Sequence, residues 1–167
     1  MISSKYDWQF ATNFTDEKFL KKAKKAGLEP AAASLLYQRG VQTEEALQEF
    51  LEPSLDQLHD PYDLHDMERA VNRIRSAIEN YEQILIYGDY DADGMTSASI
   101  VKETLEQLGA ECQVYLPNRF TDGYGPNSSV YKYFIENQGI SLIITVDNGV
   151  AGLEAIDLAQ SLGVDVI

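Results

Sequence analysis

Three aspartates occupy alternate positions in one short segment, residues 88–94, which contains Asp89, Asp91 and Asp93 between two glycines. Holding three ionised carboxylates together without a counter-charge costs several kcal/mol at an effective dielectric constant of about 20. No lysine or arginine lies close to them in the sequence. One or two divalent cations would remove this repulsion, and carboxylate oxygens suit Mg²⁺, Mn²⁺ or Ca²⁺. The segment therefore predicts a metal site; the alternative is a solvated acidic turn in which Asp93 caps a helix.

A fourth aspartate, Asp147, follows a separate apolar run at residues 142–146. If both apolar runs are neighbouring strands of a parallel sheet, the aspartates that follow them converge at the carboxyl ends of those strands. Asp147 is then placed to bridge two metal ions about 4 Å apart, which would activate a water and neutralise a phosphoryl oxygen. Because Asp-Asn-Gly is also an ordinary turn sequence, Asp147 alone does not establish a site.

Two other motifs share part of this pattern. The spacing of Asp89, Asp91 and Asp93 matches the first half of an EF-hand loop, but the twelfth position is Ile100 instead of glutamate, and an apolar strand-like run precedes the loop. Residues 91–96 also resemble the first motif of haloacid-dehalogenase-type phosphatases, in which the first aspartate is a nucleophile. That interpretation leaves Asp89 without a role, yet it stays open as an alternative enzyme class.

A polar loop at residues 117–126 follows a second apolar run and contains Arg119, Gly123, Tyr124 and Gly125. An arginine fork can hold a phosphate, a tyrosine can stack on a base, and glycines allow a ligand to approach the backbone. The loop therefore predicts a substrate-binding surface. A tight Gly-Pro turn with an exposed tyrosine explains the same residues equally well.

The elements that must position these residues alternate between strands and helices from residue 83 onward. Gly109, Gly139 and Gly163 end the predicted helices at 96–108, 128–138 and 153–162. Short apolar runs at 84–87, 114–116, 142–146 and 164–167 predict strands that are buried on both faces. The predicted fold class is therefore α/β, a parallel sheet flanked by helices with right-handed crossovers.

The first half of the chain predicts helices instead. Glycine and proline bound helical segments at 16–26, 31–38 and 44–51, and a longer helix follows Asp66. We therefore expect a helical N-terminal region at 1–80 and the first part of an α/β catalytic domain at 81–167. The chain stops within its fourth predicted strand, so the sequence predicts that this domain is incomplete.

The net charge excludes some classes of binding partner. The chain has 167 residues and a net charge of −14, and residues 81–167 hold 13 acidic but only three basic side chains. This excludes a simple basic nucleic-acid binder and predicts no binding to anionic membranes. The single Cys112 fits a reducing compartment, and residues 1–10 show no signal-peptide core. We expect a cytoplasmic protein.

The motifs together resemble one family. The run YGDYDADGMT at 87–96 is similar to the first motif of RecJ-type exonucleases in the DHH phosphoesterase superfamily. Residues 117–119 with 123–125, and TVDNG at 145–149, resemble the second and third motifs. LYQRG at 36–40 and FLEP at 50–53 are similar to the segment that precedes that catalytic core. The likeness covers nearly the whole chain.

This resemblance implies 5′–3′ hydrolysis of single-stranded DNA with Mn²⁺ or Mg²⁺ at a two-metal site, in DNA repair and recombination, with other repair proteins as further partners. It implies a catalytic and metal-binding set, Asp89, Asp91, Asp93 and Asp147, and a substrate-facing set, Arg119, Gly123, Tyr124 and Gly125. The Asp-His-His motif of the superfamily is expected after Ile167, so we expect the 167-residue chain alone to be inactive or nearly so. The remaining alternatives are a phosphoesterase acting on short or cyclic nucleotides and a module that only binds a metal or a partner.

Overall fold

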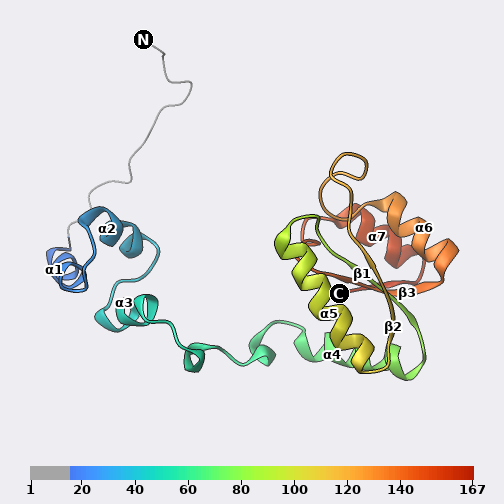
Figure 1. Cartoon of the computed structure of the whole chain (residues 1–167), viewed down its shortest axis with the longest axis horizontal. Coiled ribbons are helices and arrows are strands. Elements are labelled where there is room, and N and C mark those ends of the chain that lie inside the picture. Colours follow the sequence, from blue (N-terminus) through green and yellow to red (C-terminus); the bar gives the residue numbers. More distant parts are fainter. Residues whose placement is uncertain (1–15) are drawn as a thin grey trace, which may run out of the picture. The chain divides into compact units, whose positions relative to one another are not determined.

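The computed structural model describes residues 16–167, which form two compact units divided between Asp60 and Pro61 (Figure 1). Residues 1–15, where a signal peptide would be sought, lie outside the described part. No helix within residues 16–167 combines the length and the apolar character that crossing a membrane requires.

The first unit is built from three short helices, α1 (Glu17–Lys25), α2 (Pro30–Gln38) and α3 (Glu44–Leu51). The carboxylate of Asp16 accepts hydrogen bonds from the backbone N–H groups of Lys18 and Phe19, which caps α1. A small core holds the helices together, formed by Phe19, Ala23, Ala33 and Leu47. The helices confirm the segments predicted from glycine and proline punctuation.

The second unit contains a parallel sheet in the order β2-β1-β3-β4. Its strands are β1 (Gln83–Tyr87), β2 (Glu111–Tyr115), β3 (Ile140–Thr145) and β4 (Asp165–Val166). The predicted fold class is confirmed. In this order the chain moves from β1 to one side and later returns to the other side, so the direction of winding reverses between β1 and β3.

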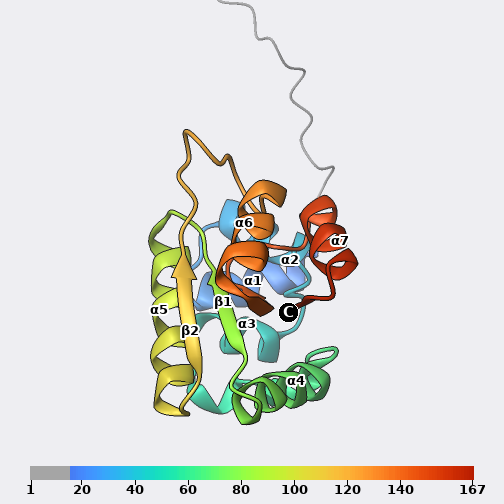
Figure 2. The ribbon, with the colours of Figure 1, turned by 90° about the vertical axis from the view of Figure 1, so that its right-hand side faces the viewer.

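Helices cover both faces of the sheet, because alternate residues of β1 point into two different apolar cores. Ile84 and Ile86 of β1 pack with residues of α4 (Met67–Glu79) and α5 (Ala92–Gln107). Leu85 and Tyr87 point to the opposite face and pack with α6 (Ser128–Gln138) and α7 (Leu153–Ser161). Both ribbon views show the strands between α5 and α6 (Figures 1 and 2).

The structure places the boundary between the units before α4, earlier than the boundary at residue 80 that the sequence predicts. The reason is packing: Ala77 of α4 is fully buried against the sheet, with Ile74 and Ile78 beside it. Two short 3-10 turns, η1 (Leu55–Gln57) and η2 (Pro61–Asp63), precede this helix. Helical periodicity predicts α4 correctly but cannot tell which core its apolar face joins.

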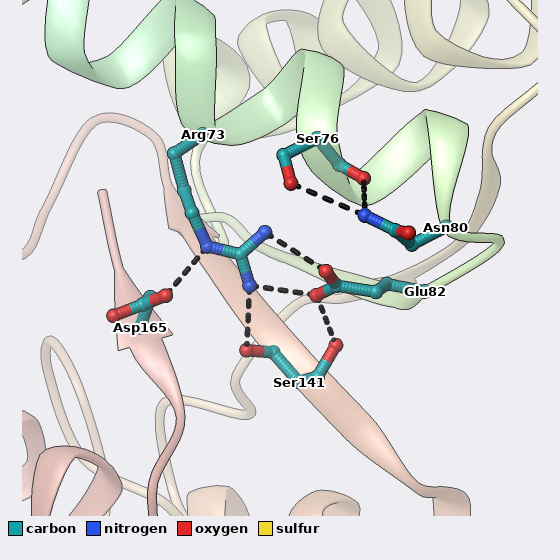
Figure 3. A network of polar contacts seen from close by, with 6 residues as sticks. All are labelled: Arg73, Ser76, Asn80, Glu82, Ser141 and Asp165. Carbon is teal, nitrogen blue, oxygen red and sulfur yellow. Dashed lines mark hydrogen bonds and ion pairs between the residues drawn. The ribbon is translucent and has the colours of Figure 1, made fainter.

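A polar network fixes α4 to the amino ends of three strands (Figure 3). The Arg73 guanidinium donates to both carboxylate oxygens of Glu82, at 3.2 and 2.6 Å, and to the Asp165 carboxylate at 2.5 Å. Ser141 contributes its backbone carbonyl to Arg73 and its hydroxyl to Glu82. The helix is therefore held in place by ionic contacts as well as by its apolar face.

Candidate metal centre

Three of the predicted carboxylates converge at the carboxyl edge of the sheet. Oxygen atoms of Asp89, Asp91 and Asp147 all lie within 4.8 Å of one another. Asp89 is 2% exposed, whereas Asp91 and Asp147 face solvent. The first two follow β1 and the third follows β3, the two strands between which the winding reverses. This is the place where open α/β sheets bind ligands.

Asp89 is fixed by the close approach of α5 to the end of β1. Its carboxylate accepts a hydrogen bond from the Tyr90 backbone N–H at 2.7 Å. A Cβ atom at Gly94 would lie 2.5 Å from backbone atoms of Asp89, so only glycine permits this contact. Gly94, the second glycine of the motif, thus allows the first turn of α5 to pack directly against Asp89.

Asp91 is the N-cap of α5. One of its carboxylate oxygens accepts a hydrogen bond from the backbone N–H of Gly94 at 3.0 Å. The structure therefore gives the cap to Asp91, where the solvated-turn interpretation had placed Asp93. The helix dipole favours a negatively charged side chain at this end, so a carboxylate suits the N-cap position of α5.

Asp147 adopts a left-handed backbone conformation, with φ of 60°. Loss of hydration raises the pKa of its carboxyl above the ordinary value, and the negative charges of Asp91, Asp93 and Asp89 raise it further. Such a shift is the electrostatic signature of carboxylates brought together without a counter-charge. A divalent cation bound between them would reverse it.

Asp93 lies in the first turn of α5 and does not belong to the group of three. Its carboxylate is exposed, and its backbone carbonyl accepts hydrogen bonds from the hydroxyls of Thr96 and Ser97. Its charge still reaches the cluster, since it contributes to the raised pKa of Asp147. Its role as a metal ligand stays a prediction.

Within residues 16–167, no lysine or arginine forms an ion pair with any of the four aspartates. The converging donor atoms are all carboxylate oxygens, a set that suits hard cations such as Mg²⁺ and Mn²⁺ and disfavours metals that require thiolate or imidazole ligands. The residues present therefore fit the predicted cofactor, both in chemistry and in their uncompensated charge.

The loop after β2 is organised by Asp122, which the sequence did not single out. Its carboxylate accepts hydrogen bonds from the Asn118 backbone N–H and the Tyr115 hydroxyl, both at 2.7 Å. These donors lower the pKa of Asp122. Burial and the contact with Asp122 raise the pKa of Tyr115 to about 12. Asp122 therefore acts as an ionised anchor for the loop.

Two of the predicted residues of this loop, Arg119 and Tyr124, lie against Tyr90. The Arg119 guanidinium lies 5.7 Å from the centre of the Tyr90 ring, and the Tyr124 ring lies 6.4 Å from it at 73°. Tyr90 stands between Asp89 and Asp91 in the sequence. A cation and an aromatic ring of the loop therefore lie against a residue of the first motif, and of these three residues only Arg119 and Tyr124 were predicted.

The two predicted glycines adopt the left-handed conformation, with φ of 81° at Gly123 and 79° at Gly125. The Gly125 carbonyl accepts a hydrogen bond from the buried hydroxyl of Tyr87 at 3.0 Å, so this end of the loop is attached to β1. Between this loop and the one after β3 lies a groove of about 500 Å³, lined by Tyr124, Gly125, Pro126, Asp147, Asn148, Gly149, Val150, Ala151 and Gly152. Asp147 forms part of the groove wall.

Comparison with known proteins identifies the family. Residues 83–167, which begin at β1 and include all four aspartates, match the model of the DHH family, N-terminal domain. The chain belongs to the DHH family. This membership favours a DHH-type phosphoesterase over the haloacid-dehalogenase-type phosphatase that the sequence left open.

Relatives of this DHH chain are described as single-stranded-DNA-specific exonuclease RecJ. The protein of Bacillus subtilis is 41% identical over 167 residues, which are all of this chain and 21% of the relative. The protein of Escherichia coli is 35% identical over 144 residues, 85% of this chain and 24% of the relative. The chain thus spans about a fifth of the length of the B. subtilis relative.

Two solved structures resemble the DHH chain. A structure of exonuclease RecJ bound to manganese is 29% identical with a TM-score of 0.57, covering 62% of this chain and 26% of the other. A structure of RecJ in complex with Mn²⁺ from Thermus thermophilus is 25% identical with a TM-score of 0.55, covering 89% of this chain and 20% of the other.

Sequence reasoning missed three residues of this DHH-family site: Tyr90, Asp122 and Asn148. Tyr90 lies inside the first motif, so its place between two aspartates was a usable signal. The contact of Asp122 with Tyr115 depends on how the loop folds back on β2, which no sequence pattern records. Asn148 bonds to a residue 60 positions away and could be found only from the sheet order.

Proposed function

We propose that this chain supplies the metal-binding part of the active centre of an exonuclease that acts on single-stranded DNA. The observation that carries the proposal is the convergence of Asp89, Asp91 and Asp147 within 4.8 Å at the winding reversal, without a cationic partner in the described part of the chain. Membership of the DHH family and the description of the relatives support the substrate class.

The proposed cofactor is Mn²⁺ or Mg²⁺, supported by the oxygen-only cluster and by the manganese in the two related structures. A bound cation at such a site lowers the pKa of a water and stabilises charge on a phosphoryl oxygen. In this proposal Asp89, Asp91 and Asp147 hold the cation. Asp93 adds negative charge at the rim and is proposed as a further member of the set.

The substrate-facing residues are proposed to act on either side of Tyr90. Arg119 would bind a backbone phosphate, since a guanidinium forms paired hydrogen bonds with phosphate oxygens. Tyr124, 73% exposed, would stack on a base, and the left-handed Gly123 and Gly125 would shape the loop around it. The groove beside Asp147 would receive the nucleotide next to the scissile phosphate.

Several finer features stay predictions: 5′–3′ polarity, participation in repair and recombination, contact with other repair proteins, and a cytoplasmic location. The catalytic role of residues 81–167 and the lead-in role of residues 1–80 are likewise proposals. We further propose that the 167 residues alone are inactive or nearly so, since they span only about a fifth of the B. subtilis relative.

The experiment uses two proteins: the 167-residue chain, and a chimera in which the chain replaces the matching segment of the B. subtilis relative. Each is incubated with Mn²⁺ and with single-stranded DNA labelled at the 5′ or the 3′ end. We expect the chimera to release nucleotides from the 5′ end and the chain alone to release almost none. An inactive but folded chimera would contradict the proposed function, and rapid turnover by the chain alone would contradict its inactivity.

A second candidate is a phosphoesterase for short or cyclic nucleotides. The groove of about 500 Å³ favours it, because this volume lies in the range of small-ligand sites. The same chimera decides between the two: preferential cleavage of dinucleotides over long single strands would support the second candidate. Unchanged cleavage by Asp91→Ala would instead favour a module that binds a partner and does not catalyse.

A further inference from the structure

Asn148 connects the two strand ends that carry the acidic cluster. Its side-chain Nδ2 donates a hydrogen bond to the Gly88 carbonyl at 2.8 Å and a second to the Val146 carbonyl at 3.2 Å. Gly88 immediately precedes Asp89, and Val146 immediately precedes Asp147. A single amide group therefore holds the backbone next to two of the three converging carboxylates.

The position of this amide follows from how β1 and β3 separate. Their backbone pairing continues as far as the Val146 N–H, which donates to the Tyr87 carbonyl at 3.0 Å. Beyond it the left-handed Asp147 turns the chain away from β1. The Asn148 side chain then supplies the next hydrogen bond toward β1, so the link between the strands extends to the residue before Asp89.

The remaining polar atom of the amide, Oδ1, is enclosed. Asn148 Oδ1 is buried and, within residues 16–167, receives no hydrogen bond. A buried acceptor without a donor is uncommon in a folded protein. Asn148 also lines the groove next to Asp147. Within residues 16–167, the two hydrogen bonds that Nδ2 donates are therefore the polar contacts of this side chain.

We propose that Asn148 is a positioning residue of the metal centre: its neutral amide restrains the Asp89 and Asp147 strand ends against carboxylate repulsion. This rests on the proposed function, because it requires a cation at the cluster. An aspartate of the same shape would lose the donor and add a negative charge, so the proposal requires an amide at this position.

The test measures Mn²⁺ affinity of the 167-residue chain by the electron paramagnetic resonance signal of free Mn²⁺, with circular dichroism to verify folding. The variants are Asn148→Ala, Asn148→Asp and the control Asn80→Ala. Asn80 also donates its amide to a backbone carbonyl, that of Ser76 at 2.8 Å, but it lies at the C-cap of α4 and bonds within that helix (Figure 3). We expect both Asn148 variants to lose about 10- to 100-fold in affinity and the control to match the wild type.

Asn148→Asp and Asn148→Ala distinguish a residue that positions the strand ends from one that only lies near the cation. If Asn148 served only as another oxygen near the cation, Asn148→Asp would bind Mn²⁺ at least as tightly as the wild type, and that result would overturn the proposal. Wild-type affinity in folded Asn148→Ala would overturn it as well. A further variant, Asp147→Asn, tests the metal site itself. If it also bound Mn²⁺ like the wild type, the proposed metal site would be wrong. If only Asp147→Asn lost affinity for Mn²⁺, the proposed function would stand and the role of Asn148 would be refuted.

Discussion

The two edges of the parallel sheet both gather acidic side chains, and they differ in what neutralises them. At the amino edge, Glu82 and Asp165 share the guanidinium of Arg73. At the carboxyl edge, oxygen atoms of Asp89, Asp91 and Asp147 lie within 4.8 Å of one another, and no cationic side chain within residues 16–167 pairs with them. The first cluster is complete within the described chain, whereas the second requires a charge from outside it.

The pKa shifts at the two edges have opposite directions. Hydrogen bonds from Arg73 and then from Ser141 lower the pKa of Glu82, so the ionised form is stabilised by folding. At the other edge, lost hydration and neighbouring aspartates raise the pKa of Asp147, so the ionised form is destabilised. Carboxylates that a fold tolerates despite such a cost are candidates for function, while compensated ones serve stability.

The largest expected effect is a loss of kcat when a carboxylate of the carboxyl edge is replaced. Asp91→Asn retains a side chain that can cap α5 but removes one charge from the cluster. In the chimera with the B. subtilis relative we expect kcat to fall about 1,000-fold or more, since metal-assisted charge stabilisation contributes several kcal/mol. Glu82→Gln is the matched control at the amino edge and should keep kcat within about twofold. Equal losses in both variants would contradict the division of roles.

The next largest effect is a loss of stability when the Arg73 network at the amino edge is removed. Arg73 and Glu82 are each 23% exposed, so Arg73→Ala leaves Glu82 partly buried without its charged partner. We expect the free energy of unfolding to fall by about 2 kcal/mol, measured by urea denaturation of the 167-residue chain. The control is Arg75→Ala on the exposed side of the same helix, which should change it by less than about 0.5 kcal/mol. Identical losses at the two positions would mean that the network adds no stability.

The pH dependence sharpens the same contrast. Because the folded pKa of Glu82 lies below its unfolded value of about 4.3, its stabilisation is complete above that value. It is lost as the pH falls through the folded pKa. Glu82→Gln should therefore be less stable than the wild type near pH 7, and the difference should shrink on acidification below about pH 4. A difference that stays constant with pH would show that the carboxylate charge of Glu82 is not the cause.

The smallest expected effect has the opposite sign. Asp147→Asn removes a carboxylate whose ionisation is disfavoured in the folded chain, so the variant should unfold at a higher temperature than the metal-free wild type. Differential scanning calorimetry in the presence of a chelator measures this shift. A lower unfolding temperature would indicate that Asp147 stabilises the fold, contrary to its placement in an uncompensated cluster.

The carboxyl edge could be predicted from the sequence because each of its aspartates closely follows an apolar strand. Apolar strands followed by aspartates indicate both the α/β class and the convergence of Asp89, Asp91 and Asp147. Asp93 shares the alternate spacing but lies in the first turn of α5 and outside the group of three, because the helix begins directly after Asp91. Spacing in the sequence does not carry that distinction.

The amino edge could not be predicted, because its partners meet only through the sheet order. Arg73 and Asp165 are 92 residues apart and meet only after β4 is placed beside β3. The same contacts explain why α4 belongs to the second unit. Asn148 was missed for the same reason, since its link to Gly88 exists only where β1 and β3 are neighbours.

The most direct test of the central claim is a calorimetric Mn²⁺ titration of the wild-type chain, Asp147→Asn and Glu82→Gln, each verified as folded. If the carboxyl edge is the metal centre, the wild type and Glu82→Gln will bind Mn²⁺ with the same affinity, and Asp147→Asn will bind at least about tenfold more weakly. Equal binding by all three proteins, or loss of binding in Glu82→Gln alone, would contradict the account.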